Sequence, residues 1–202
     1  MKKSKRPRTN KLKTDLQNGF SVREKHIADI EVSSVAASAA APAGAVAATA
    51  STASTKTITT GINQPAWPRN ITATAGGTAT DIKAIQVVVE GTNFADEKIT
   101  ETLPAFTVDT AGIVTGNKAF KTISKITIPA HDGTGATTSI GFGTKLGLPY
   151  RLDRNSVIAA YRNGAREATA PTITLDAVAM ENNTFTLSSA LNGTQVNVEL
   201  TV

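Results

Sequence analysis

Short runs of alternating apolar and polar residues, each ended by Gly, Asn, Asp or Pro, recur along most of this chain. The most apolar and β-branched run spans residues 81–90, where Ile85, Val87 and Val89 share one face at a period of two. β-Branched side chains lose rotamer freedom in a helix and suit a pleated surface, so we expect a central strand here. A chain patterned in this way is largely restricted to an all-β fold.

The same alternation predicts other strands, at residues 71–75, 98–103, 106–108, 113–114, 118–128, 156–161, 172–179, 184–187 and 194–202. Within 118–128 the parity of Ile123 differs from that of Ile126 and Ile128, which indicates a bulge. Asn192-Gly193 between the last two runs is a signal for a two-residue hairpin. About eight to ten short strands fit an antiparallel β-sandwich of jelly-roll or immunoglobulin-like type.

The positive charge of the chain is concentrated at its N-terminus. Residues 1–31 hold nine Lys or Arg and four Asp or Glu, whereas residues 32–202 hold twelve of each sign. A nucleic-acid-binding domain more often carries its cations on the folded face, interleaved with aromatic residues. The basic segment therefore reads as a tail, with three interpretations: a solvated disordered tail, a segment that docks on a neighbouring subunit, or a ligand for phosphate backbone.

We expect residues 1–56 to form an extended arm that precedes a β-sandwich domain at 57–202. Residues 33–60 are rich in Ala, Ser and Thr and predict a flexible linker. Residues 21–31 predict a short helix, capped by Ser21, that is marginal without a surface to lie on. We hypothesise that the arm is an intersubunit clasp in a homodimer or homotrimer, with contacts from Lys2, Lys3, Lys5, Arg6, Arg8, Lys11, Lys13, Val22, Ile27 and Ile30.

Several classes of protein are disfavoured by composition. The chain has no cysteine, which excludes disulfides, thiol catalysis and Cys-ligated metals, and its two histidines are too few for a histidine-rich metal cluster. No run approaches the ~20 apolar residues that a membrane-spanning helix needs. The N-terminus also lacks the Leu-, Ile- or Phe-rich centre of a signal peptide.

Three local patterns suggest chemistry, and each has a simpler interpretation. Residues 141–147 are glycine-rich but lack the spacing of a dinucleotide or phosphate loop, so a hairpin or surface loop is favoured. His131-Asp132 are adjacent and would face opposite sides of a strand, with no serine placed by motif. The acidic residues Asp96, Glu97 and Glu101 lack the alternating spacing of a calcium loop. We therefore expect no enzyme activity and no cofactor or metal.

Two features suggest weaker contact sites on the domain. Trp67, the one tryptophan, either fills one end of the core or contributes to an interface, with the core interpretation favoured. Arg151 and Arg154 belong to the domain's one basic cluster, together with Arg162 and Arg166. Asp153 and Glu167 offset that charge, so a solvated face is favoured and an interface is the alternative.

The segments Gln64-Pro-Ala-Trp-Pro-Arg-Asn-Ile71, Gly116-Asn-Lys-Ala-Phe-Lys-Thr-Ile-Ser-Lys-Ile126 and Gly143-Thr-Lys-Leu-Gly-Leu148 resemble small virion proteins of tailed bacteriophages. The likeness covers residues 60–150. It implies a β-rich structural protein of the particle, with capsid cement or decoration as the expected role and the capsid surface as its place. The resemblance leaves head-fibre, neck and tail positions open.

These observations support a structural role, in which the chain binds the major capsid protein or other virion subunits. The alternative is a head-fibre, neck or tail protein, for which a host-glycan-binding surface would use aromatic side chains such as Trp67, Tyr150 and Tyr161. A third hypothesis, binding of packaged nucleic acid through the basic arm, is less favoured. A membrane partner is not expected.

Overall fold

The structure, a computed structural model, describes residues 26–202. These residues form antiparallel strands and two single-turn 3-10 helices, with no α-helix among them. The strands are β1 (Ile27–Val32), β2 (Ala41–Ala50), β3 (Lys56–Ile58), β4 (Arg69–Gly77), β5 (Val88–Thr92), β6 (Lys98–Thr102), β7 (Gly112–Phe120), β8 (Thr122–Ile128), β9 (Ala136–Gly147), β10 (Val157–Arg162), β11 (Ala165–Arg166), β12 (Thr172–Thr174), β13 (Thr184–Thr186) and β14 (Val196–Thr201). The 3-10 helices are η1 (Ala79–Asp81) and η2 (Met180–Asn182).

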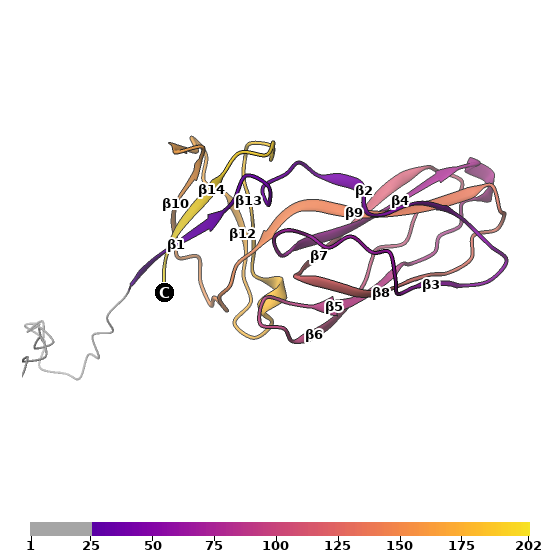
Figure 1. Cartoon of the computed structure of the whole chain (residues 1–202), viewed down its shortest axis with the longest axis horizontal. Coiled ribbons are helices and arrows are strands. Elements are labelled where there is room, and N and C mark those ends of the chain that lie inside the picture. Colours follow the sequence, from indigo (N-terminus) through magenta and orange to yellow (C-terminus); the bar gives the residue numbers. More distant parts are fainter. Residues whose placement is uncertain (1–25) are drawn as a thin grey trace, which may run out of the picture.

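Eight consecutive strands form a nested set of antiparallel pairs. β2 pairs with β9, β3 with β8, β4 with β7 and β5 with β6. The additional pairs β4–β9 and β5–β8 complete two facing sheets, with strand orders β2-β9-β4-β7 and β3-β8-β5-β6. One long antiparallel ribbon wrapped into two sheets in this way is a jelly roll. The predicted antiparallel sandwich is confirmed, in its jelly-roll form (Figure 1).

The interior of the jelly roll is filled by aliphatic side chains and two phenylalanines. Ile71, Val89, Phe120, Ile126 and Ile140 are fully buried between the two sheets. Each such side chain stabilises the fold by roughly 1.5–3 kcal/mol relative to leaving it in water. The predicted bulge is present, because the register between β5 and β8 shifts at Glu90–Gly91 and so lets Ile123 and Ile126 both point inward.

The predicted central strand is shorter than its hydrophobic pattern. Ile85, Val87 and Val89 are buried as expected, but β5 begins only at Val88. The carbonyls of Val87, Ile85 and Ile82 accept hydrogen bonds from the amides of Leu103, Phe106 and Asp109, which are three residues apart instead of the two of a regular strand pair. Bonds with unequal spacing on the two segments hold the chain extended without forming a ladder. Similarly, residues 106–108 form no strand, and residues 118–128 divide at Lys121 into β7 and β8.

A second lobe adjoins one end of the jelly roll (Figure 1). Its outer layer is a sheet with the order β1-β14-β10-β11, which we call the end sheet. The opposite layer is β12-β13, which continues the jelly-roll sheet because β13 pairs with the last residues of β9. Leu146 and Leu148, at the end of β9, share the second apolar core with Phe185 of β13 and Val198 of β14. The twelve-residue strand β9 therefore belongs to both lobes.

The N-terminal part of the chain departs from the prediction. β1 pairs with β14 over six residues and β2 pairs with β9, so residues 27–50 belong to the folded body rather than to an arm that ends at residue 56. The small Ala and Gly side chains of 33–50 allow this close packing, since Ala36, Ala37 and Ala45 are buried. Within the predicted helix 21–31, residues 27–31 are strand, because a short helix gains less than six paired residues in a sheet. Residues 1–25 lie outside the described residues.

The predicted hairpin at Asn192-Gly193 is also wrong. Gly193 does adopt a positive φ of 80°, as a turn requires, but β13 and β14 do not pair with each other. β14 instead lies between β1 and β10, where Val196, Val198 and Leu200 face the second core. The predicted strand 172–179 is ordered as a strand only at Thr172–Thr174, since Asp176 turns the chain by accepting bonds from the amides of Val178 and Ala179.

Candidate interaction surface

The paired residues His131 and Asp132 are structural. The imidazole is buried, its Nδ1 accepts a hydrogen bond from the Lys83 amide at 3.1 Å, and its Nε2 lies 2.9 Å from Thr138 Oγ1. Because Nδ1 accepts, the proton of the neutral ring resides on Nε2 and is donated to Thr138. Burial lowers the pKa of His131, while Asp132 points outward to Lys83 Nζ at 3.0 Å. This ring holds a turn together and has no substrate-facing nitrogen.

The acidic residues considered for calcium have separate partners. Asp96 binds Lys121, Glu97 binds Arg151, and Glu101 accepts hydrogen bonds from the amides of Asn117 and Lys118. Burial raises the pKa of Glu101, although those two amides act in the opposite direction. Within residues 26–202, no group of three or more His, Cys, Asp or Glu is arranged to hold a metal ion.

The glycine-rich segment 141–147 is neither a phosphate loop nor the surface hairpin that was favoured, because it lies inside β9. Its glycines allow close approach of backbone. A Cβ on Gly141 would lie 2.0 Å from the carbonyl oxygen of Ala41, where β2 begins. A Cβ on Gly143 would meet the side chain of Asn70 at 2.4 Å. The pattern therefore serves packing within the sheet.

Two of the predicted contact residues bind within the chain. Arg151 Nη2 donates to both carboxylate oxygens of Glu97 at 2.7 Å, and its Nε donates to the carbonyl of Val178. A bond from the Asn93 side chain and then Arg151 lower the pKa of Glu97. The Trp67 indole N–H donates to the Gly147 carbonyl at 3.0 Å, and its half-buried ring packs edge-on against Phe94 with centroids 5.3 Å apart. Both side chains thus join the jelly roll to the second lobe.

The basic cluster does not assemble as one patch. Arg162 binds Glu167 at 3.5 Å, whereas Arg154 and Arg166 are exposed.

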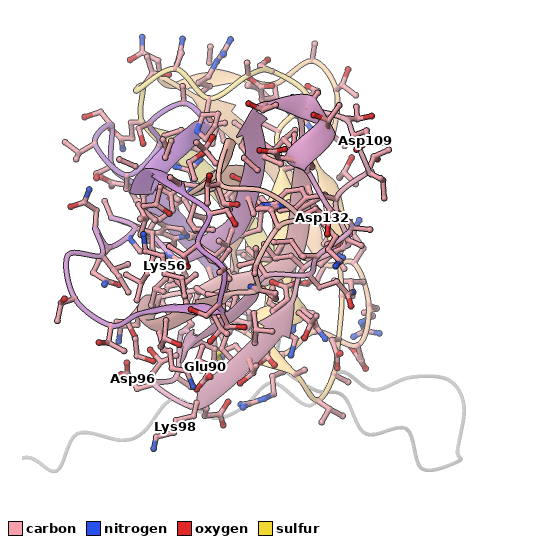
Figure 2. All side chains as sticks on the ribbon, turned by 90° about the vertical axis from the view of Figure 1, so that its right-hand side faces the viewer. Lys56, Glu90, Asp96, Lys98, Asp109 and Asp132 are labelled. Carbon is pink, nitrogen blue, oxygen red and sulfur yellow. The ribbon has the colours of Figure 1, made fainter. Side chains whose placement is uncertain are left out.

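A hollow of about 560 Å³ beside β10 is lined by Ile158, Ala159, Arg166 and Pro171, among other residues. Figure 2, which views the molecule from its jelly-roll end, shows charged residues of both signs around the outline, including Glu90, Asp96 and Lys98. The labelled residues in that view show no concentration of one sign.

Arg69 is a buried cation that sequence reasoning missed. Its side chain is almost fully buried, and its donors reach the carbonyl oxygens of Gly143 on β9 and of Ser38 in the segment between β1 and β2. Burial lowers the pKa of the guanidinium to about 10, so it remains charged at neutral pH. No carboxylate of the described residues binds it. No sequence signal marks this role, since its partners are backbone carbonyls brought together only by the fold.

The end sheet presents the clearest surface for a partner. Register places Asp29, Glu31 and Glu199 on its outer face, together with Asn197 of β14 and Tyr161 of β10. Ile30 points to the other side and is buried in the second core, whereas Ile27 is 69% exposed. The remaining predicted arm residues, from Lys2 to Val22, lie outside the described part of the chain. Ile27 begins β1 beside the C-terminal Val202, at one end of the molecule (Figure 1).

No helix of residues 26–202 combines the length and hydropathy that crossing a membrane requires. No protein-family model, curated protein or solved structure matches the chain.

Proposed function

We propose that this chain is a virion structural protein of a tailed phage, a capsid cement or decoration protein that bridges neighbouring major capsid subunits. The observation that carries the proposal is the separation of charge from the folded body. Residues 1–25 hold nine cations and two anions, whereas residues 26–202 hold twelve cations and fourteen anions. A strongly basic segment attached to a weakly acidic body is suited to binding an acidic surface by electrostatic attraction.

The body has the properties of a rigid spacer. The jelly-roll interior is filled by side chains, and the long strand β9 together with Arg69 links it to the second lobe. Jelly rolls serve viral capsids, lectins and cupins, so the fold alone does not select a function. The absence of a three-residue metal cluster within 26–202 disfavours a cupin-like metal site. The stretch that resembles phage virion proteins, residues 60–150, also covers most of this jelly roll.

The alternative role, a head-fibre, neck or tail protein that binds host glycans, has less support. Glycan sites commonly use accessible aromatic faces, and none of the aromatic side chains in residues 26–202 is among the exposed large hydrophobic residues. A glycan array probed with the full-length chain separates the two roles. Specific binding to a host glycan would favour the alternative.

The test of the cement role compares the intact chain with a full-length variant in which Lys2, Lys3, Lys5, Arg6, Arg8, Lys11 and Lys13 are changed to Gln. Both are mixed with phage heads that have been stripped of the chain, and binding is measured by co-sedimentation. We expect the variant to bind at least about tenfold more weakly, because the substitutions remove seven positive charges. Its thermal unfolding should be unchanged, because the substitutions alter no residue of the two described cores. Equal binding of the two proteins, or no binding by the intact chain, would overturn the proposal.

Binding to packaged DNA through the same residues predicts a different response. DNA affinity would fall steeply with added salt in a DNA-only assay without heads. Tight, salt-sensitive DNA binding together with no head binding would favour that role instead.

A further inference from the structure

The outer edge of β1 is open in the described structure. His26 and Val202 exchange two backbone hydrogen bonds, which makes the even-numbered residues of β1 the ones that bond to β14. The backbone N–H and C=O groups of Ile27, Asp29 and Glu31 therefore point away from β14. Within residues 26–202 no strand or side chain satisfies these groups. An unpaired edge of this kind is a template for another extended strand.

The side chains next to this edge are acidic. Asp29 and Glu31 are exposed on the outer face of the end sheet, and Glu199 lies beside Asp29 on β14. Arg166, the cation that shares this face, is on β11 at the opposite edge, roughly 14 Å from β1 at three strand spacings. A strand that adds to β1 would thus meet two carboxylates spaced by two residues.

The chain carries a segment that matches this spacing. In an extended strand, residues two apart lie on the same face, as Asp29 and Glu31 do. The N-terminal segment contains four such cation pairs, Lys3/Lys5, Arg6/Arg8, Lys11/Lys13 and Arg23/Lys25. The Arg6/Arg8 pair has a further property, because Pro7 between the two arginines lacks an N–H. With Arg6 and Arg8 bonded to β1, Pro7 would face outward and leave the new edge without a donor at that position.

We infer that the Arg6-Pro7-Arg8 segment of a second copy of this chain adds to the open edge of β1, with Arg8 opposite Asp29 and Arg6 opposite Glu31. The pairing is antiparallel and extends the end sheet by one strand contributed by a neighbour. The inference goes beyond the proposed function, because it adds a contact between copies of this chain to the contact of the arm with the capsid. Its test needs no capsid, so the inference and the proposed function can fail independently.

A tight turn within one chain would not give the same pairing. Asn18-Gly19 is a signal for a two-residue turn, and such a turn makes its flanking residues 17 and 20 a hydrogen-bonded pair. The even-numbered residues that follow would then bond to the returning strand. In β1 the even-numbered residues already bond to β14. A hairpin at this turn would therefore place the returning strand on the side of β1 that β14 occupies. A donated strand from another copy has no such restriction.

Disulfide trapping tests the inference directly, because the chain contains no cysteine. Full-length Arg8→Cys and Asp29→Cys variants are mixed at equal concentration under mild oxidation. We expect a disulfide-linked heterodimer at least tenfold more abundant than in a control mixture of Arg8→Cys with Lys98→Cys. Lys98 is exposed on β6, which belongs to the jelly-roll sheet β3-β8-β5-β6 and not to the end sheet. A yield equal to the control would overturn the inference.

Two other outcomes would overturn it in specific ways. A dilute double variant that forms its disulfide within one chain would show that the segment returns to its own β1. Rapid dimerisation of Asp29→Cys alone would show that β1 edges pair with each other.

A charge exchange supplies an independent test, in which self-association is measured by sedimentation. Asp29→Lys with Glu31→Lys should weaken self-association at least tenfold, and adding Arg6→Glu with Arg8→Glu should restore it.

Discussion

The jelly roll and the second lobe are both two-layer β structures, but they use the chain in different ways. The jelly roll is made from one continuous stretch, β2 to β9, whose strands nest in order. The second lobe combines β1 from the N-terminal side with β10–β14 from the C-terminal side, so that Asp29 contacts Asn197, 168 residues away. The second lobe must therefore join segments that flank the jelly roll in the sequence. Both lobes also contain buried polar side chains that hold irregular connections in place.

Those polar contacts centre on buried amides and one guanidinium. In the second lobe, Asn183 Oδ1 accepts from the amides of Leu152 and Asp176, while its Nδ2 donates to the carbonyls of Asp176 and Ala179. The Asn182 side chain and then the amides of Ala179 and Val178 lower the pKa of Asp176 to about 2. One side chain thus fixes long irregular connections of the second lobe. In the jelly roll, the buried Asn93 has a similar role, because its Oδ1 accepts from the amides of Ala95 and Glu97 in the β5–β6 turn.

The largest effect is expected from the jelly-roll core. Phe120→Ala removes a fully buried ring and should reduce the free energy of unfolding by about 3–5 kcal/mol. Because β9 and Arg69 join the lobes, we expect a single urea transition that moves to lower denaturant, and Phe185→Ala in the second core should move the same transition. Two transitions, each sensitive to one substitution, would show that the lobes unfold independently.

Asn183→Ala tests the polar organisation of the second lobe. It leaves two amides and two carbonyls without their partner, so we expect a loss of about 1–3 kcal/mol in the free energy of unfolding. The matched control is Asn192→Ala, an exposed amide in the same lobe, with an expected change below about 0.5 kcal/mol. Similar losses for the two variants in urea unfolding would contradict the role given to Asn183.

The buried ring of His131 in the jelly roll predicts that the free energy of unfolding depends on pH. Burial holds its pKa below the ordinary value of 6.5, so the unfolded state binds a proton more readily than the folded state. The free energy of unfolding should therefore fall as pH decreases below 6.5, by up to about 1.4 kcal/mol per pH unit until the folded ring also protonates. His131→Gln should lower stability at neutral pH and remove this contribution to the slope. An unchanged slope in urea titrations from pH 7.5 to 5 would contradict the assignment.

The smallest effect is expected at the ion pair in the same turn. Lys83 Nζ and Asp132 are both 55% exposed, and exposed pairs contribute little because water and salt screen them. Lys83→Ala keeps the backbone amide that binds His131, so we expect a change below about 0.5 kcal/mol. A loss above about 1 kcal/mol would mean that the side chain of Lys83, rather than its amide, holds the turn.

The sequence predicted the parts of the fold that depend on local alternation. The bulge at Ile123–Ile126 and the shared buried face of Ile85, Val87 and Val89 follow from side-chain parity, and the structure confirms them. The pairing partner of a strand is not a local property. Asn192-Gly193 therefore marked a true turn but the wrong hairpin, since β14 gains more by completing a core between β1 and β10.

The candidate surface was predictable only in part. The charge of the N-terminal segment is visible in the sequence, but the acidic face it could meet is not, because Asp29 and Glu199 become neighbours only through the pairing of β1 with β14. Alanine-rich residues 33–50 were expected to be a linker because they contain little apolar area. Their small size is what allows β2 to cross Gly141 closely, a contact that composition does not reveal.

The pairing of β1 with β14 in the end sheet has a consequence for how the protein folds during synthesis. The ribosome delivers β1 about 170 residues before β14, an interval of roughly ten to thirty seconds at ordinary elongation rates. The jelly roll has all its strands once residue 147 has emerged, yet β1 has no strand to join until β14 has been made. A product that terminates early would thus keep an unpaired apolar strand, and quality-control proteases could recognise incomplete copies by it.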